Sequence, residues 1–234
     1  MSLFICRNIF YNSSYIFKDI LKTINVIESE EVILKQLCHR YEHWQKLLSK
    51  LPDSFGRLKQ QGLLAELLVL KDNLIPNYGV EQALAMWQGP KGAKQDFILP
   101  ENWMEVKSTN LGKREIHISS LEQLDSTISD GELVVITLQD SNSFDTNAIS
   151  LSLIIDEIEC IITDDLTLAD FKERLLLVGY GQNQDNEFYF RLCDIEYFNI
   201  NKSFPKIRRA DLPAAISTVS YTLNLDALLN FKLK

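Results

Sequence analysis

The order of elements from Leu58 onward constrains the fold of this chain more than any other feature. Apolar residues at helical spacing predict a helix over 58–74. Short apolar runs then predict strands over 96–99, 103–108 and 133–138. Helical and strand segments that alternate in this way are typical of an α/β fold. We therefore expect a mixed central sheet flanked by helices.

The rest of the chain adds elements on both sides of this core. A helix is predicted before Ser49, 116–118 is expected to extend the sheet, and Ser119 or Ser120 is expected to cap a helix that ends near Ile128. The stretch 75–94 is rich in turn residues, with a strand or helical turn at 83–87. Toward the C-terminus we expect a helix at 168–177, strands at 188–192 and 195–200, and a turn at Gly179-Tyr-Gly181.

We found no sequence signal for a linker that would divide the chain. We expect one domain with three parts: an N-terminal helical part, a core, and a C-terminal extension packed on that core. Their expected ranges are 1–57, 58–140 and 141–234.

Composition excludes several classes of protein. The chain is 46% hydrophobic and 24% charged, and it has no apolar run of about 18 residues that could span a membrane. Its four cysteines form no CxxC pair, so we expect reduced core thiols in a cytoplasmic protein. The formal net charge of −8 disfavours a general nucleic-acid coat. It is compatible with a local site that handles nucleic acid through metal ions.

Two neighbouring strands carry the residues with the clearest chemistry. Strand alternation places Glu105 and Lys107 on one face. If a four-residue loop joins the strands, Ile98 faces Trp103 and Asp96 faces Glu105. A slip of one residue would separate the two carboxylates.

Opposed carboxylates repel one another, and a cation between them removes that cost. Hard divalent ions such as Mg²⁺ take carboxylate and carbonyl oxygens as ligands. A metal-bound water can attack phosphorus, and the Lys107 ammonium could orient that water or neutralise charge on the phosphate. Glu66 borders the apolar stripe of the 58–74 helix, where a carboxylate needs a partner. These residues suit metal-assisted phosphodiester hydrolysis.

Asp96, Glu105-x-Lys107 and the upstream Glu66 resemble the PD-(D/E)XK nuclease superfamily. The chain from about Trp44 onward resembles, more closely, an uncharacterised bacterial PD-(D/E)XK-type family linked to restriction or phage-defence systems. The pieces that carry this likeness stand in order along the chain: Gly62-Leu-Leu-Ala-Glu66-Leu, Trp87-Gln-Gly-Pro90, Asp96-Phe97, Glu105-Val-Lys107-Ser and Ser119-Ser-Leu-Glu-Gln123-Leu. Members of that family have further sequence before this start, so the resemblance implies a shortened N-terminus.

The resemblance implies a restriction-endonuclease-like α-β-β-β-α-β core and a Mg²⁺-dependent nuclease, with Mn²⁺ as a substitute. It implies DNA as substrate, defence-system proteins as partners and, for double-strand cleavage, a homodimer. The implied site residues are the metal ligands Asp96 and Glu105 with the Val106 carbonyl, the catalytic Lys107, the auxiliary Glu66, and Gln123 near the lysine. One departure is that Gln95 stands where the superfamily has its named proline.

Other interpretations of the same residues stay open. Glu105 and Lys107 alone could form an exposed cross-strand ion pair, and Ser120-x-x-Gln123 could be a capping box. Basic residues that flank the proposed site could contact phosphate or carry solvated loop charge. These residues are Lys91, Lys94, Lys113 and Arg114. The protein could also be a non-catalytic subunit that binds DNA or a partner protein, or an enzyme that acts on another phosphate ester. The sequence does not choose between DNA and RNA.

Overall fold

The helix predicted over 58–74 is confirmed and begins the described core. In this computed structural model, which describes residues 55–126, 130–181 and 187–233, α3 spans Arg57–Val69 and a π-helical turn, η1, continues it over Leu70–Leu74. The segment forms a helix because it has no proline and is rich in Leu, Ala, Gln and Lys, which favour helix. Nearly all of its apolar side chains are buried.

The turn-rich stretch that follows is more helical than predicted. It contains α4 (Ile75–Tyr78) and α5 (Val80–Met86), separated by Gly79. Gly79 adopts φ 78°, a left-handed conformation that favours glycine and ends the first helix. The expected strand or helical turn at 83–87 is thus the end of α5. A 3₁₀ turn, η2 (Gly89–Lys91), then leads toward the sheet.

The expected mixed central sheet is confirmed. It has five strands in the order β1-β2-β4-β6-β5, in which β2 and β4 are parallel and the other neighbours are antiparallel. The strand bounds are Phe97–Ile98 for β1, Trp103–Asn110 for β2, Gly131–Ser141 for β4, Ile149–Ser150 for β5 and Tyr189–Ile200 for β6. The two C-terminal strands predicted at 188–192 and 195–200 are one strand, β6, whose register against β4 shifts beside Cys193.

The expected α-β-β-β-α-β order is wrong in two places. The third strand, β3 (Glu115–Ile118), does not extend the central sheet but pairs with β7 (Tyr221–Asn224) in a separate two-stranded sheet. The helix expected after Ser119 is only a 3₁₀ turn, η3 (Leu121–Gln123), and residues 127–129 lie outside the described part. The third strand pairs elsewhere because Ile116 and Ile118 are buried in a hydrophobic cluster that β3 and β7 help to build.

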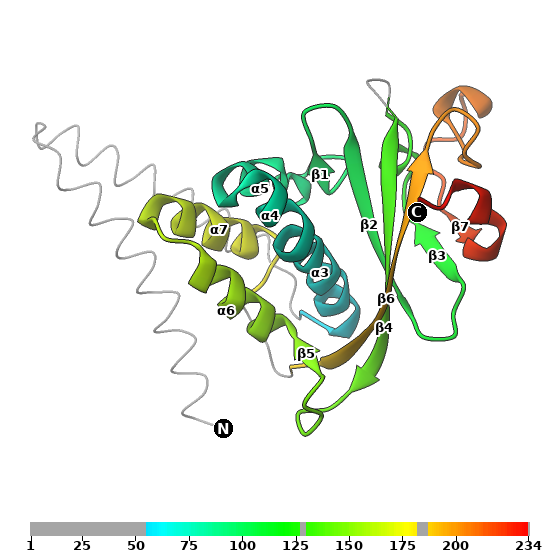
Figure 1. Cartoon of the computed structure of the whole chain (residues 1–234). Coiled ribbons are helices and arrows are strands. Elements are labelled where there is room, and N and C mark those ends of the chain that lie inside the picture. Colours follow the sequence, from blue (N-terminus) through cyan, green and yellow to red (C-terminus); the bar gives the residue numbers. More distant parts are fainter. Residues whose placement is uncertain (1–54, 127–129, 182–186, 234) are drawn as a thin grey trace, which may run out of the picture. The chain divides into compact units, whose positions relative to one another are not determined.

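Both faces of the central sheet are covered. Figure 1 shows α3 on one side of β2, β4 and β6, with β3 and β7 on the other. This hydrophobic cluster combines Trp103 of β2, two residues of β4 and two of β6 with residues of β3, with Leu124 directly after η3, and with the C-terminal 3₁₀ helix η5 (Leu225–Phe231). β2 is therefore an interior strand of the layered core, and its charged residues are set in an apolar environment.

The C-terminal half contributes to the same sheet as the predicted core. Residues 149–150 and 189–200 lie in the five-stranded sheet, so the sheet extends across the expected 140/141 boundary. Two helices separate these strands: α6 (Leu151–Ile161), which the sequence interpretation missed, and α7 (Asp165–Leu177), which extends the predicted 168–177 helix. A further 3₁₀ turn, η4, covers Arg209–Asp211.

The chain divides into two compact units. One comprises Gly56–Lys172 and Asn186–Lys234, and it contains every predicted site residue. The other comprises Met1–Phe55 and Glu173–Asp185; its described residues are Phe55 and 173–181, with the Phe55 and Tyr180 rings edge to face. The turn expected at Gly179-Tyr-Gly181 is confirmed. The N-terminal helix expected before Ser49 lies outside the described residues, as do Cys6 and Cys38.

Two smaller predictions concern the burial of the cysteines and the absence of a membrane-spanning segment. Cys160 and Cys193 are exposed, so the prediction of core thiols is wrong for both of the described cysteines. Each sits at a position that faces solvent, one on α6 and the other at the register shift of β6. Among the described helices, none is long and apolar enough to cross a membrane.

Candidate active site

The register predicted for the first hairpin is confirmed, and it places Asp96 opposite Glu105. Ile98 pairs with Trp103 and Phe97 with Met104, so the next position along β1 meets Glu105. The Leu99 N–H donates to the carbonyl of Asn102 at 2.9 Å and closes the four-residue loop. The length of this loop sets the register, because it fixes which residues on its two sides lie opposite each other.

Asp96 is held at the edge of β2 by its own side chain. Its Oδ2 accepts a hydrogen bond of 2.8 Å from the Val106 N–H, in place of a backbone carbonyl of the neighbouring strand. Burial raises the pKa of the half-buried Asp96 carboxyl, while this backbone hydrogen bond and the Lys107 charge act in the opposite direction. Asp96 therefore stays next to the backbone of the Glu105-x-Lys107 segment.

Glu105 is a buried carboxylate with an adjacent ammonium. Its side chain is 1% exposed, and Lys107 Nζ, on a side chain 17% exposed, lies 2.7 Å from Oε1. Among the described residues, neither carboxylate oxygen accepts a hydrogen bond of ordinary geometry. Burial and the nearby Asp96 charge raise the pKa of Glu105 to about 8, although Lys107 acts to lower it. The pair is therefore not the exposed cross-strand ion pair that the sequence left open.

Glu66 joins the group from α3. Its half-buried carboxylate accepts a hydrogen bond of 2.8 Å at Oε2 from the indole Nε1–H of Trp87. Burial raises the pKa of Glu66 well above its ordinary value, and the Asp96 charge raises it further. The charges of Glu105 and Lys107 also act on Glu66, which shows that the four ionisable groups share one neighbourhood.

The four groups fit a divalent cation that keeps part of its water shell. Among the described residues, no three His, Cys, Asp or Glu side chains converge closely enough to form a ready-made metal centre. The donors present are hard carboxylate oxygens, which suit Mg²⁺ or Mn²⁺. Both oxygens of Glu105 are buried, and the Lys107 ammonium lies 2.7 Å from Oε1. Mg²⁺ binds through one or two carboxylates and retains several waters, so it does not need a closed cage.

Gln123 is engaged in a local contact. Its Oε1 accepts hydrogen bonds from the N–H and the hydroxyl of Ser119, at 2.9 and 3.0 Å. The N-cap of η3 is Ser120, which makes no side-chain capping hydrogen bond, so the Ser120-x-x-Gln123 capping box that the sequence left open is not formed. The described hydrogen bonds of Gln123 go to Ser119, and none joins it to the carboxylates or to Lys107.

The basic residues that flank the site differ in how free their side chains are to contact phosphate. Lys91, Lys94 and Lys113 are exposed, and Lys91 Nζ lies 3.8 Å from Asp170. Arg209 of η4 and Lys94 both act on Glu122, whose pKa is lowered chiefly by hydrogen bonds from its own backbone and from Ser120. Lys94 and Arg209 are therefore both near Glu122 of η3.

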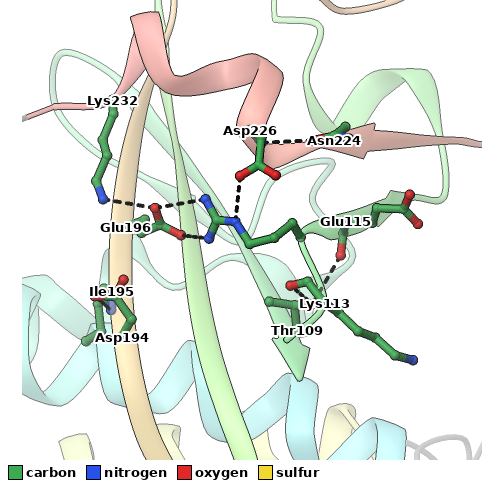
Figure 2. Close-up of polar contacts among 10 residues, drawn as sticks. Thr109, Lys113, Glu115, Asp194, Ile195, Glu196, Asn224, Asp226 and Lys232 are labelled. Carbon is green, nitrogen blue, oxygen red and sulfur yellow. Dashed lines mark hydrogen bonds and ion pairs between the residues drawn. The ribbon is translucent and has the colours of Figure 1, made fainter. Parts of the chain in front are cut away.

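Arg114 is committed to an ion-pair cluster. Its guanidinium contacts Glu196 at 2.8 Å and Asp226 at 2.9 Å, and Lys232 lies 2.9 Å from the same Glu196 (Figure 2). The Glu196 side chain is 3% exposed, and its ion pair with Arg114 lowers the pKa of its carboxyl. Arg114 thus joins the β2–β3 connection to β6 and η5, a structural role in addition to the phosphate contact expected from the sequence.

Two residues at the site had no assigned role in the sequence interpretation. Trp87 holds Glu66, and Gly89 lies against both Glu66 and Asp96. Both belong to the Trp87-Gln-Gly-Pro90 piece, which contributed only to the family resemblance. A tryptophan two residues before a glycine in a turn-rich stretch was the available signal, but Glu66, the partner of Trp87, is 21 residues away in the sequence.

The comparisons with known proteins give one family match. The chain matches a family model described as "Putative PD-(D/E)XK family member (DUF4420)" over residues 8–226. No curated protein and no solved structure matches it. The matched range contains α3, the hairpin, Asp96 directly before β1, and Glu105 of β2.

Proposed function

Because the chain belongs to this PD-(D/E)XK family, we propose that it is a divalent-metal-dependent nuclease that hydrolyses phosphodiester bonds, with DNA as its substrate. The resemblance predicted from the sequence is confirmed at the level of the family. The observation that carries the proposal is the meeting of Glu66, Asp96, Glu105 and Lys107 from a helix and two adjacent strands.

In this proposal, Asp96 and Glu105 hold the cation with the Val106 carbonyl, and Glu66 supports it from α3. When bound, the cation makes a water easier to deprotonate and neutralises charge on the phosphate. Lys107 is drawn to Glu105 by an ion pair. Once the Glu105 carboxylate is directed to the cation, Lys107 Nζ can donate to the attacking water or to a phosphate oxygen.

The exposed cations beside the site are the proposed phosphate contacts. Lys91, Lys94 and Arg209 lie next to η2 and η3, which border the start of β1. Lys113 extends this set from the β2–β3 connection. Arg114 would contact phosphate only through the part of its side chain left exposed by Glu196 and Asp226. The basic side chains would offset the net charge of −8 near the substrate.

The biological setting is proposed from the family resemblance. We place this nuclease in a restriction or phage-defence system, with other proteins of that system as partners. Cleavage of both strands of a duplex requires two active sites, so we propose a homodimer for that activity.

The first test is calorimetric titration of Mg²⁺ and Mn²⁺ into the wild-type protein and Asp96→Asn. Cleavage of single-stranded DNA, duplex DNA and RNA is assayed alongside. Asp156→Asn, at an exposed position of α6, is the matched control. We expect binding and cleavage in the wild type and control and loss of both in Asp96→Asn. Cleavage that persists in highly purified Asp96→Asn would overturn the proposed mechanism.

The same experiment tests a second candidate, a non-catalytic subunit with this fold. That candidate is favoured by the Glu105–Lys107 ion pair, which occupies two of the four site residues with each other. Failure of the wild type to bind either ion, even with DNA present, would support it. In that case DNA or partner binding would survive Glu105→Ala. Turnover of small phosphodiesters without cleavage of polymers would identify a different phosphate-ester substrate.

A further inference from the structure

The segment Trp87-Gln88-Gly89 contacts two residues of the candidate site at once, Glu66 and Asp96. Trp87 ends α5, forms an isolated β-bridge with Phe97, and is fully buried. Its ring packs against Phe171, with centroids 6.2 Å apart, and its Nε1–H donates to Glu66 at 2.8 Å. The packed indole has one orientation, so it presents its single donor to Glu66 in one direction.

The backbone of the same segment holds Asp96. The N–H groups of Gln88 and Gly89 both donate to the Asp96 carbonyl, each at 2.9 Å. The side chain of Asp96 is held separately by the Val106 N–H. Asp96 is therefore fixed through its main chain by one segment and through its carboxylate by another.

Gly89 lies where the two carboxylates approach each other. A Cβ at this position would lie 3.2 Å from Asp96 Oδ1 and 3.5 Å from Glu66 Oε2. Gly89 does not have the left-handed conformation of the positive-φ glycines in the described chain, so its backbone suits any residue. The observation that explains a glycine here is the space that a side chain would fill.

We propose that Trp87 and Gly89 are positioning residues of the site: Trp87 fixes Glu66, and Gly89 keeps the space between Glu66 and Asp96 open for a hydrated divalent cation. This inference rests on the proposed function. It assigns a role to the Trp87-Gln-Gly-Pro90 piece, which contains neither a proposed metal ligand nor the proposed catalytic lysine. Both residues act through the carboxylates they contact, not on the reacting atoms.

The test of Gly89 compares two glycine-to-alanine variants of the full chain. Gly89→Ala adds a methyl group beside the carboxylates, whereas Gly62→Ala adds one where no heavy atom lies within 4 Å. Mn²⁺ affinity is measured by calorimetry and paramagnetic resonance, and the unfolding midpoint by circular dichroism. We expect Gly89→Ala to lose about 10-fold or more in Mn²⁺ affinity with a nearly unchanged midpoint, and Gly62→Ala to bind as the wild type does.

The test of Trp87 uses the Glu66→Gln background. If Trp87 acts through Glu66, Trp87→Phe weakens Mn²⁺ binding in the wild type but has no further effect once Glu66 is Gln. A purely structural role would instead lower the unfolding midpoint equally in both backgrounds and leave Mn²⁺ affinity unchanged.

The outcomes separate this inference from the proposed function. Wild-type binding together with unchanged affinity in Gly89→Ala, or with an undiminished Trp87→Phe effect in Glu66→Gln, would overturn the inference and leave the nuclease proposal standing. Wild-type protein that binds no Mn²⁺ would overturn the nuclease proposal and the inference with it.

Discussion

Glu105→Gln is expected to stabilise the metal-free protein at alkaline pH, although it removes a proposed ligand. Burial and Asp96 raise the pKa of Glu105 from 4.5 to about 8. A carboxyl whose pKa is higher in the folded than in the unfolded state contributes its full stability when the pH is below its pKa in the unfolded state. That stability is lost as the pH rises through the folded value. The window for Glu105 therefore runs from about pH 4.5 to pH 8.

The size of the effect follows from the same numbers. A pKa raised from 4.5 to about 8 means that the ionised Glu105 carboxylate destabilises the folded state by at most about 5 kcal/mol at pH 8 and above. The attraction to Lys107, which lies 2.7 Å from the carboxylate, already lowers this pKa and is therefore included in the shift. Local relaxation and water penetration reduce the cost of a buried charge below this limit, and we expect a gain of about 2 kcal/mol from its removal. For a chain of 234 residues, that gain corresponds to a midpoint about 4–8 °C higher.

Chemical denaturation between pH 5 and pH 9 with a chelator measures this difference. Glu101→Gln, in the exposed loop between β1 and β2, controls for the removal of a surface charge. The advantage of Glu105→Gln should be small at pH 5 and grow to its full value by pH 8, because Asp96, Glu66 and Lys107 are the same in both proteins. A variant less stable than the wild type at pH 8, or a difference independent of pH, would refute the reasoning.

Three further variants test the site and its supports. Lys107→Met should lower cleavage about 100-fold or more while Mn²⁺ still binds, because the ammonium acts on the reacting groups; unchanged cleavage would exclude it from the mechanism. Glu196→Gln should destabilise the fold by about 2–3 kcal/mol in urea unfolding at pH 7, because it removes the buried anion on which the partly exposed Arg114 and Lys232 converge. A loss at pH 3 as large as that at pH 7 would contradict this, because the lowered pKa of Glu196 confines the effect to higher pH. Gly131→Ala should destabilise the fold by about 1–3 kcal/mol, because the added Cβ would overlap the Trp103 indole. Gly62→Ala, the control, should not destabilise it. Equal unfolding midpoints for these two variants would refute the overlap.

Local patterns were sufficient for the parts of the site that are near in sequence. The turn at Pro100-Glu101-Asn102 and the alternation of its flanking strands predicted the register that sets Asp96 against Glu105, and the structure has that register. The apolar stripe of α3 likewise placed Glu66 at its border. Hairpin register and helix face depend on interactions within a few residues, which is why they could be predicted.

Long-range pairing was beyond the same patterns. The segment of β3 alternates polar and apolar residues as an edge strand of the central sheet would, but it pairs with β7 more than 100 positions away, where its isoleucines are buried. Arg114 could not be assigned to Glu196, 82 residues distant, from any local signal. The helix expected after Ser119 is only a 3₁₀ turn, in which the Gln123 side chain bonds back to Ser119.

The sequence by itself determined the residue types, their order and the hairpin that joins two of the carboxylates. Only the tertiary structure decided the burial and the pKa values of these carboxyls. Layers on both faces of the sheet remove Glu105 from water, and Trp87 and Gly89 bring Glu66 beside Asp96. Burial and charge proximity depend on which distant segments pack together, and it is these that raise the pKa values of the three carboxyls.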